Sequence, residues 1–186
     1  MVHIRGHDGL GVCTCNSPCS HPLSLAPHAQ CQVGGLSDRV QAVALSSCGR
    51  LMATGDQAGE VAFWDVFSGA VLFTLHGHSS EVVALASSQD GHLLASLDRG
   101  GAILLWDVGN RTLKHRLNLP GVTSHFCPMH ISLDGQKLAC GGPAGAVWIW
   151  DLKTRELLQT LKGHARPVTS LAFAPNGETL ATSGKP

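Results

Sequence analysis

The chain has 186 residues, which is enough for one domain with a terminal tail. Hydrophobic residues make up 44% of the sequence and charged residues 14%, so the composition supports a packed core and excludes a chain that is disordered throughout. Lysine plus arginine and aspartate plus glutamate number 13 each, and this balance argues against a nucleic-acid-binding surface driven by phosphate attraction.

Nothing in the sequence indicates a membrane protein or a secreted one. It has no apolar run of about 18 residues, the length that a membrane-spanning helix needs. Residues 1–12 contain no apolar segment that would serve as a secretory leader. We therefore expect no membrane partner, reduced thiols for the seven cysteines, and an intracellular location in the cytoplasm or nucleus.

Residues 1–33 form a leader rich in Cys, His and Pro, and we predict that it is irregular or disordered. Its potential metal ligands are Cys13, Cys15, Cys19, His21, His28 and Cys31. Their Cys-x-Cys and Cys-x3-Cys spacing departs from the paired Cys-x2-Cys of zinc knuckles, so we predict no metal site and no cofactor. A zinc-binding module in the leader stays open as an alternative.

From residue 34 onward, one order of elements recurs. An apolar strand comes first, at 40–45, 82–86, 126–133 and 168–173. A Gly-containing turn and a short second strand follow, at 51–54, 93–96, 137–140 and 179–183. A third strand ends on Trp-Asp, at 61–64, 103–106 and 147–150, and a fourth lies at 70–75, 112–117 and 156–161. The pattern predicts four-stranded antiparallel units at about 34–75, 76–117 and 118–161, with a partial unit at 162–186.

The turn between the first and second strands of each unit has its own signature. It reads Cys48-Gly49, Asp90-Gly91, Asp134-Gly135 and Asn176-Gly177. Asp-Gly and Asn-Gly favour a two-residue type I′ turn, which requires positive φ at both central residues. We therefore predict type I′ hairpins at these positions.

Three residue types repeat with the same period. The Trp-Asp pairs are Trp64-Asp65, Trp106-Asp107 and Trp150-Asp151, and their tryptophans lie 42 and 44 residues apart. The turn glycines and an alanine column (Ala53, Ala95, Ala139 and Ala181) follow the same steps. A period in the low forties that ends on Trp-Asp is typical of propeller blades.

Over roughly residues 34–186 the chain resembles the WD40-repeat family, which also places Gly-His before the first strand, as at Gly77-His78 and Gly163-His164. The resemblance implies an all-β WD40-type propeller segment with three complete four-stranded blades and half of a fourth. It also implies that His78 and His164 are structural members of a His, Ser/Thr, Asp and Trp hydrogen-bond network. The Ser/Thr positions are Thr54, Ser96, Cys140 and Thr182.

The chain departs from the family pattern in its acidic position. The network Asp is expected six positions before each Trp, where this sequence has Ala58, Gly100 and Ala144. Asp56 and Asp98, two residues earlier, are the available substitutes, whereas the third unit has Gly142 there. We expect the third blade to keep only Trp150 of its network and to be looser, because a buried indole N–H without an acceptor is costly.

Nothing in the sequence supports an enzyme, because Asp65, Asp107 and Asp151 recur once per blade and fit strand-end turns. By resemblance, two columns of variable residues face one rim that contacts other proteins or peptides. One column lies ten residues before each turn glycine and includes Arg39, Glu81 and His125; the other lies seven residues before each Trp and includes Gln57 and Arg99. The candidate contact residues are Arg39, Gln57, Glu81, Arg99, His125 and Arg166. Pro143 and Pro167 complete the columns.

The resemblance implies a non-catalytic scaffold for protein–protein assembly. Because propellers close with about four to eight blades, we expect a fragment, a truncated isoform without independent activity, or a segment completed by another copy. Self-association through an open blade edge is the corresponding partner hypothesis.

Overall fold

The computed structural model describes residues 39–119 and 127–184. The cysteine- and histidine-rich leader, with all of its candidate zinc ligands, lies outside the described residues, as does His125. In the part of the chain that is described, no helix has the length and apolar character needed to cross a membrane.

Within the described residues, fourteen strands form four antiparallel sheets in chain order. The first sheet contains β1 (Val40–Leu45), β2 (Leu51–Asp56), β3 (Glu60–Asp65) and β4 (Val71–His76). The second contains β5 (Val82–Ser87), β6 (Leu93–Asp98), β7 (Ala102–Asp107) and β8 (Thr112–Asn118). The third contains β9 (Met129–Ile131), β10 (Lys137–Gly141), β11 (Ala146–Asp151) and β12 (Leu157–Lys162). The last contains β13 (Val168–Phe173) and β14 (Leu180–Gly184).

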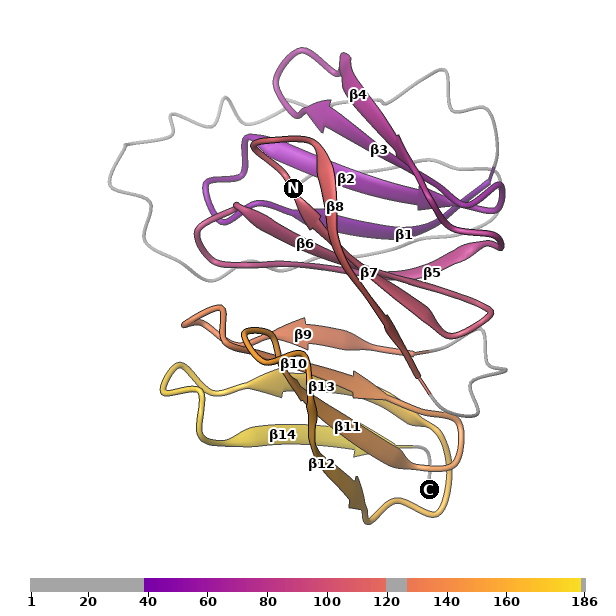
Figure 1. Cartoon of the computed structure of the whole chain (residues 1–186), viewed down its shortest axis with the longest axis vertical. Coiled ribbons are helices and arrows are strands. Elements are labelled where there is room, and N and C mark those ends of the chain that lie inside the picture. Colours follow the sequence, from indigo (N-terminus) through magenta and orange to yellow (C-terminus); the bar gives the residue numbers. More distant parts are fainter. Residues whose placement is uncertain (1–38, 120–126, 185–186) are drawn as a thin grey trace, which may run out of the picture.

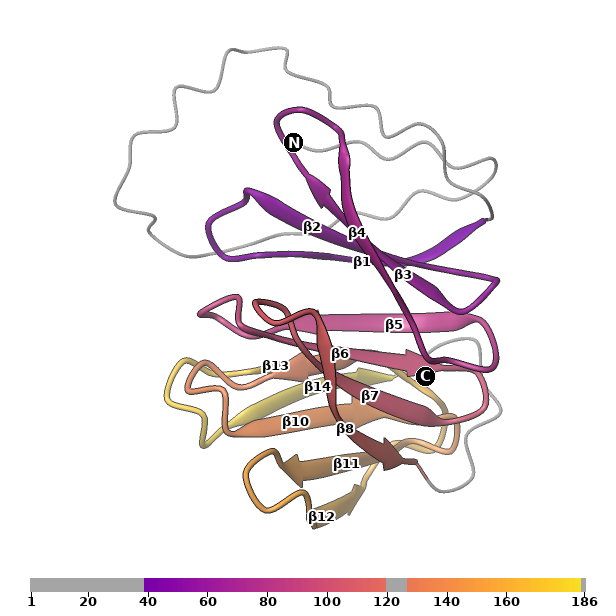
Figure 2. The same cartoon turned by 45° about the horizontal axis from the view of Figure 1, so that its top comes forward.

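The sheets lie one after another in sequence order, and we call them blades 1 to 4. In Figure 1 the indigo-to-purple blade 1 lies above the magenta blade 2, with the orange and yellow blades below, and Figure 2 shows this arrangement turned by 45°. Strand β1 packs against β5, β5 against β9, and β9 against β13. These first strands therefore form the inner edge of the blades, and the predicted all-β class with three and a half blades is confirmed.

The inner strand of blade 3 is shorter than predicted. The apolar run 126–133 predicted one long strand, but β9 spans only Met129–Ile131. Proline has no N–H to donate to a ladder, and Pro128 contributes only its carbonyl, which accepts from the Gly141 N–H at 2.9 Å. At the other end, the Ser132 N–H bonds the Lys137 carbonyl at 2.9 Å and closes the turn.

The turns between the first and second strands are not type I′, so that prediction is wrong. Positive φ occurs at the glycine alone, for example 67° at Gly49 and 72° at Gly91. In blade 2 the Gly91 N–H bonds the Ser88 carbonyl at 3.1 Å, and the Asp90 carboxylate accepts from the Ser88 hydroxyl and the His92 N–H. These side-chain bonds fix a longer turn in which only Gly takes the left-handed conformation.

The hydrophobic core lies between the blades. Phe63 and Leu75 of blade 1 pack with Leu104 and Trp106 of blade 2. The next cluster joins blades 2 and 3 through Leu97, Ile103, Leu105, Leu117, Leu138, Trp148 and Trp150. A third, smaller cluster joins blades 3 and 4 through Ala139, Val147, Val168 and Leu171.

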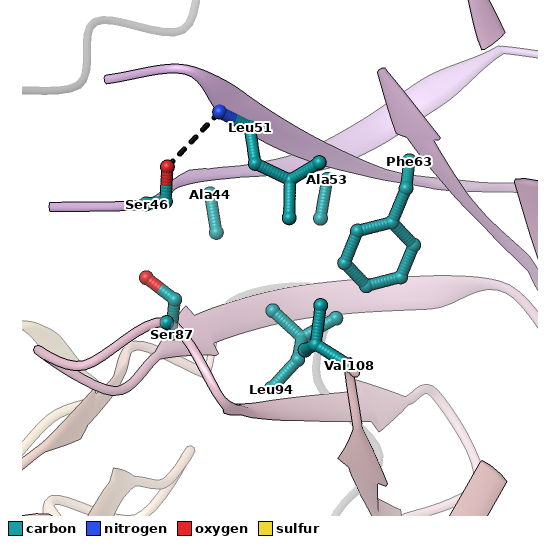
Figure 3. Close-up of a pocket in the computed structure, with 9 residues that line it drawn as sticks. Ala44, Ser46, Leu51, Ala53, Phe63, Ser87, Leu94 and Val108 are labelled. Carbon is teal, nitrogen blue, oxygen red and sulfur yellow. Dashed lines mark hydrogen bonds between the residues drawn. The ribbon is translucent and has the colours of Figure 1, made fainter. Parts of the chain in front are cut away.

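A small pocket remains between blades 1 and 2. In Figure 3 Leu51 and Phe63 of blade 1 face Leu94 and Val108 of blade 2 across it. The Ser46 hydroxyl beside the pocket accepts the Leu51 N–H at 3.0 Å. The Ser87 hydroxyl donates to the Leu45 carbonyl at 2.8 Å. Because the lining is mostly apolar and both serines already have hydrogen-bond partners, we interpret the pocket as a packing gap between two blades.

A cation–π contact also joins the first two blades. The Arg111 guanidinium lies 4.6 Å from the centroid of the Phe73 ring, and that ring stacks on Phe63 at 4.5 Å. Arg111 has a φ of 57°, and Arg155, with a φ of 68°, occupies the same position in blade 3. Both arginines therefore occupy the same turn of the repeat, and the Arg111 guanidinium contacts the preceding blade.

Candidate protein-interaction rim

Blade 2 contains a buried network of four polar side chains, His78, Ser96, Asp98 and Trp106. The Trp106 Nε1–H donates to Ser96 Oγ at 2.7 Å, and Ser96 Oγ lies 2.6 Å from His78 Nε2. His78 Nδ1 lies 3.1 Å from Asp98 Oδ2, and Asp98 Oδ1 accepts the Ala102 N–H at 2.9 Å. The network therefore ties the segment before β5 to the turn between β6 and β7.

The network is consistent with a neutral imidazole. The side chains of His78 and Asp98 are 0% and 1% exposed. Burial lowers the pKa of His78, although its hydrogen bond to Asp98 and the charge of that carboxylate act in the opposite direction. A neutral ring that donates from Nδ1 to Asp98 can accept the Ser96 hydroxyl hydrogen at Nε2, so each polar group has a partner.

The acidic member lies eight positions before the tryptophan, at Asp98, the substitute that the sequence offered for the family position. Gly100 occupies the expected position, and a Cβ there would lie 3.3 Å from Asp98 Oδ1. The carboxylate thus reaches over the turn from the end of β6, where it also caps the Ala102 N–H. Asp98 was the available substitute in the sequence, and the shifted turn explains why it is used.

Blades 1 and 4 keep parts of this network. In blade 1 the Trp64 Nε1–H donates to Thr54 Oγ1 at 2.9 Å, and the Asp56 carboxylate accepts the Glu60 N–H at 2.8 Å. In blade 4, His164 Nε2 lies 2.9 Å from Thr182 Oγ1. The threonine hydroxyl is therefore the member that both blades keep: it bonds Trp64 in blade 1 and His164 in blade 4.

Blade 3 replaces the network with apolar packing. Cys140 stands at the hydroxyl position, and the buried Trp150 Nε1 has no hydrogen-bond partner within the described residues. Trp148 covers the position of the missing carboxylate, because a Cβ on Gly142 would overlap its ring. Adding an acid at Gly142 would therefore require a smaller residue than Trp148.

The aspartates of the Trp-Asp pairs lie in turns on separate blades. The Asp65 carboxylate accepts the Phe67 and Ser68 N–H groups at 3.1 and 2.8 Å. Asp107 accepts the Asn110 N–H at 2.9 Å, and Asp151 accepts the Thr154 N–H at 2.7 Å. These donors lower the pKa of each carboxyl, to about 2 for Asp107, where Lys114 adds its charge. Each carboxylate is used locally, as strand-end turns require.

The two variable columns meet at one end of each of the first two blades, and we call this end the rim. The Gln57 N–H donates to the Arg39 carbonyl at 3.1 Å, and the Arg99 N–H donates to the Glu81 carbonyl at 2.9 Å. These bonds join the residue before each inner strand to the turn after the second strand. Side chains 18 residues apart in sequence are thus neighbours on the rim.

The rim is polar and partly paired. Arg99 Nη1 lies 2.7 Å from Glu81 Oε1, with the two side chains 45% and 14% exposed. Arg39, Gln57 and Arg166 are exposed. The sequence did not indicate that Glu60 and His76 also meet at this end, with His76 Nδ1 3.4 Å from Glu60 Oε1. The two residues are 16 positions apart and belong to no repeated motif, so their pairing had no signal in the sequence.

Across the described ranges, no group of three His, Cys, Asp or Glu side chains is arranged to hold a metal ion. A larger open cavity of about 560 Å³ lies along the inner strands. Its lining is mainly apolar and includes Leu45, Leu85, Met129, His130, Leu133 and Phe173.

Comparisons with known proteins agree with this geometry. The family described as "WD domain, G-beta repeat" matches residues 69–107 and 155–185. A search of curated proteins found no match. A chain in "Crystal Structure of Mitotic Checkpoint Complex" is 32% identical with a TM-score of 0.72, over 81% of this chain and 46% of that chain.

Two further solved structures share the fold at lower identity. "Structure of U3-55K" and "Crystal structure of RRP9 WD40 repeats" are each 22% identical with a TM-score of 0.70, over 82% of this chain and 47% of theirs. The chain thus spans about half the length of the solved chains that it matches. The chain therefore carries WD40 repeats in two matched regions, and its Trp-Asp blades resemble those of the WD40 propellers among the solved structures.

Proposed function

We propose that this chain is a non-catalytic scaffold that binds other proteins or peptides through the rim. The observation that carries the proposal is the backbone pairing of Arg39 with Gln57 and of Glu81 with Arg99. It places variable polar side chains on a backbone that hydrogen bonds hold in the same way in both blades. Such a surface can be tuned by side-chain changes without altering the scaffold.

The family and the chemistry of the rim support this role. The WD40 propeller fold is typical of protein-interaction scaffolds, and the structure matched at 32% identity comes from a complex. Arginine is enriched among residues that dominate interface energies, and the rim presents Arg39, Arg99 and Arg166. The Glu81 carboxylate already holds the Arg99 guanidinium, which reduces the entropy lost when a partner binds it.

Affinity capture with matched variants tests the proposal. The rim variant carries Arg39→Glu, Gln57→Ala and Arg99→Glu, and the control variant carries Ser47→Ala and Gln136→Ala in turns at the opposite end of the blades. Proteins retained by the wild type and the control but lost by the rim variant are the expected result. Circular dichroism must show equal β content in all three. Equal retention by all three chains would contradict a rim contact.

A specific observation also favours self-association as a second candidate. Leu75 and Leu117 are 7% and 6% exposed, whereas Leu161, at the same position in blade 3, is 36% exposed. Strand β14 has no sheet partner beyond β13 within the described residues and carries no charged side chain. Uncharged open edges pair readily with other strands. Light scattering should show a dimer that Ala181→Lys converts to a monomer, and a monomeric wild type would exclude this candidate.

A further inference from the structure

His130 is an exception in the innermost strand column. Five positions before each turn glycine, the other three blades have alanine, namely Ala44, Ala86 and Ala172. His130 is half-buried in β9 and lines the cavity along the inner strands. A histidine among alanines adds a hydrogen-bonding group that the other blades lack at this position.

The imidazole of His130 bonds the neighbouring blade. The Phe173 N–H of β13 donates to His130 Nδ1 at 3.3 Å, and the two rings lie 6.1 Å apart. The Ala174 N–H donates to the Thr179 carbonyl across the β13–β14 hairpin. Successive N–H groups of an antiparallel strand point to opposite edges, so the Phe173 N–H points away from β14. His130 therefore satisfies an N–H that the hairpin itself leaves unpaired.

This contact requires one protonation state. Nδ1 accepts a hydrogen bond only when it carries no proton, so the ring must be neutral with its hydrogen on Nε2. A proton on Nδ1 would place two N–H groups against each other. We infer that His130 is a pH-sensitive latch that holds the β13–β14 hairpin to blade 3 when neutral and releases it when protonated.

The surroundings of His130 favour the neutral form. Burial is the cause that lowers its pKa. Of the strands packed against β9, neither β5 nor β13 carries a titratable side chain. Strand β10 carries Cys140, whose pKa is raised by burial, and Lys137, whose Nζ donates to the Gly177 carbonyl at 3.1 Å. The charged groups in the adjoining turns are Asp90, Asp134 and Glu178.

The direction of the pH effect follows from this lowered pKa. Released and unfolded chains bind a proton at the ordinary histidine pKa of about 6.5, whereas the latched chain binds it only at lower pH. The latch is therefore complete above that value and is lost as the pH falls through the lowered pKa. His78 acts in the same direction on blade 2, so the test must report on blade 4 alone.

Hydrogen exchange measured by mass spectrometry on a β13–β14 peptide separates these effects, with a β1–β2 peptide of blade 1, which contains no histidine, as internal reference. Chains are compared at equal pH, so that intrinsic exchange rates cancel. His130→Asn keeps an acceptor that does not titrate, His130→Phe keeps the ring contact without an acceptor, and the exposed His92→Asn is the control. We expect wild type and His130→Asn to exchange equally at pH 7.5. At pH 5 we expect wild type to exchange about five-fold faster than His130→Asn, which is the effect of one lost hydrogen bond.

The phenylalanine variant gives a second reading. It should exchange about five-fold faster than wild type at pH 7.5 and at the same rate at pH 5, because the protonated wild type has lost the same bond. If His130→Asn does not fold, this convergence alone tests the latch. Identical exchange of wild type and His130→Asn at both pH values, or a constant ratio between wild type and His130→Phe, would overturn the inference.

Discussion

Replacing Cys140 with serine should stabilise the chain, because it supplies the acceptor that Trp150 lacks. The indole N–H of Trp150 is buried without a partner in the described structure. In blades 1 and 2 the corresponding hydroxyls accept the Trp N–H, at 2.9 Å for Thr54 and 2.7 Å for Ser96. Cys140 pairs with Trp148 as Ser96 pairs with Leu104, so a serine at 140 would point its hydroxyl toward Trp150.

The magnitude follows from two opposing terms. An unsatisfied buried N–H costs about 1–3 kcal/mol, which the new hydrogen bond would recover. Burying a hydroxyl in place of the thiol costs about 1 kcal/mol, partly offset if its own hydrogen bonds a carbonyl. In blade 1 the Thr54 hydroxyl, which accepts the Trp64 N–H, has such a partner in the Ala62 carbonyl at 3.5 Å. We expect a net gain of about 1 kcal/mol, or about 2–4 °C in Tm for a domain of this size.

Urea and thermal unfolding of four chains measure this term. They are wild type, Cys140→Ser, Trp150→Phe and the double variant. The serine should stabilise the wild type by about 1 kcal/mol and should give no gain in the Trp150→Phe background, where the phenyl ring has no N–H to donate. Cys140→Ala, which adds no acceptor, controls for the loss of the thiol. An equal effect of serine in both backgrounds would refute the reasoning, because the gain would then not depend on the indole N–H.

Three further predictions concern other groups. Burial lowers the pKa of His78, so the contribution of its neutral form to stability is complete above about pH 6.5 and is lost as the pH falls. In urea unfolding from pH 8 to 5, the free energy of unfolding should fall more steeply for wild type than for His78→Gln, and parallel curves would contradict this. Hydrogen bonds lower the pKa of the exposed Cys48, whereas burial raises that of Cys140, so peptide mapping should find Cys48 alkylated by iodoacetamide before Cys140, and the reverse order would contradict this. Burial and the charges of Arg155 and Lys114 lower the pKa of His115. His115→Phe should allow Arg155 to form the cation–π contact that Arg111 forms with Phe73, and should stabilise the contact between blades 2 and 3 by about 0.5 kcal/mol. A lower Tm would argue against it.

The strand pattern was predictable because it depends on local chemistry. Apolar runs, turn glycines and Trp-Asp ends recur in each unit, and the predicted strand at 40–45 agrees with β1. The strand at 126–133 was predicted too long because its apolar residues gave no sign of where pairing with β10 stops. The turns differ from type I′ because Ser88 and Asp90 form side-chain bonds that a dipeptide signature does not include.

The candidate site was predictable only in part. The fixed offsets identified Arg39, Gln57, Glu81 and Arg99 as variable positions, but not the ion pair between the last two, which depends on side-chain conformation. The place of Asp98 in the network depends on how the β6–β7 turn bends. The role of these residues in binding a partner stays a prediction.

The order of the blades has a consequence for how the chain folds. Each inter-blade cluster described above joins sheets that are consecutive in sequence. A blade can therefore dock on its predecessor as soon as about 40 more residues have been made, without waiting for a distant segment. Folding during synthesis would then proceed from blade 1 toward blade 4, and a ribosome that pauses between blades would expose only the last docked face.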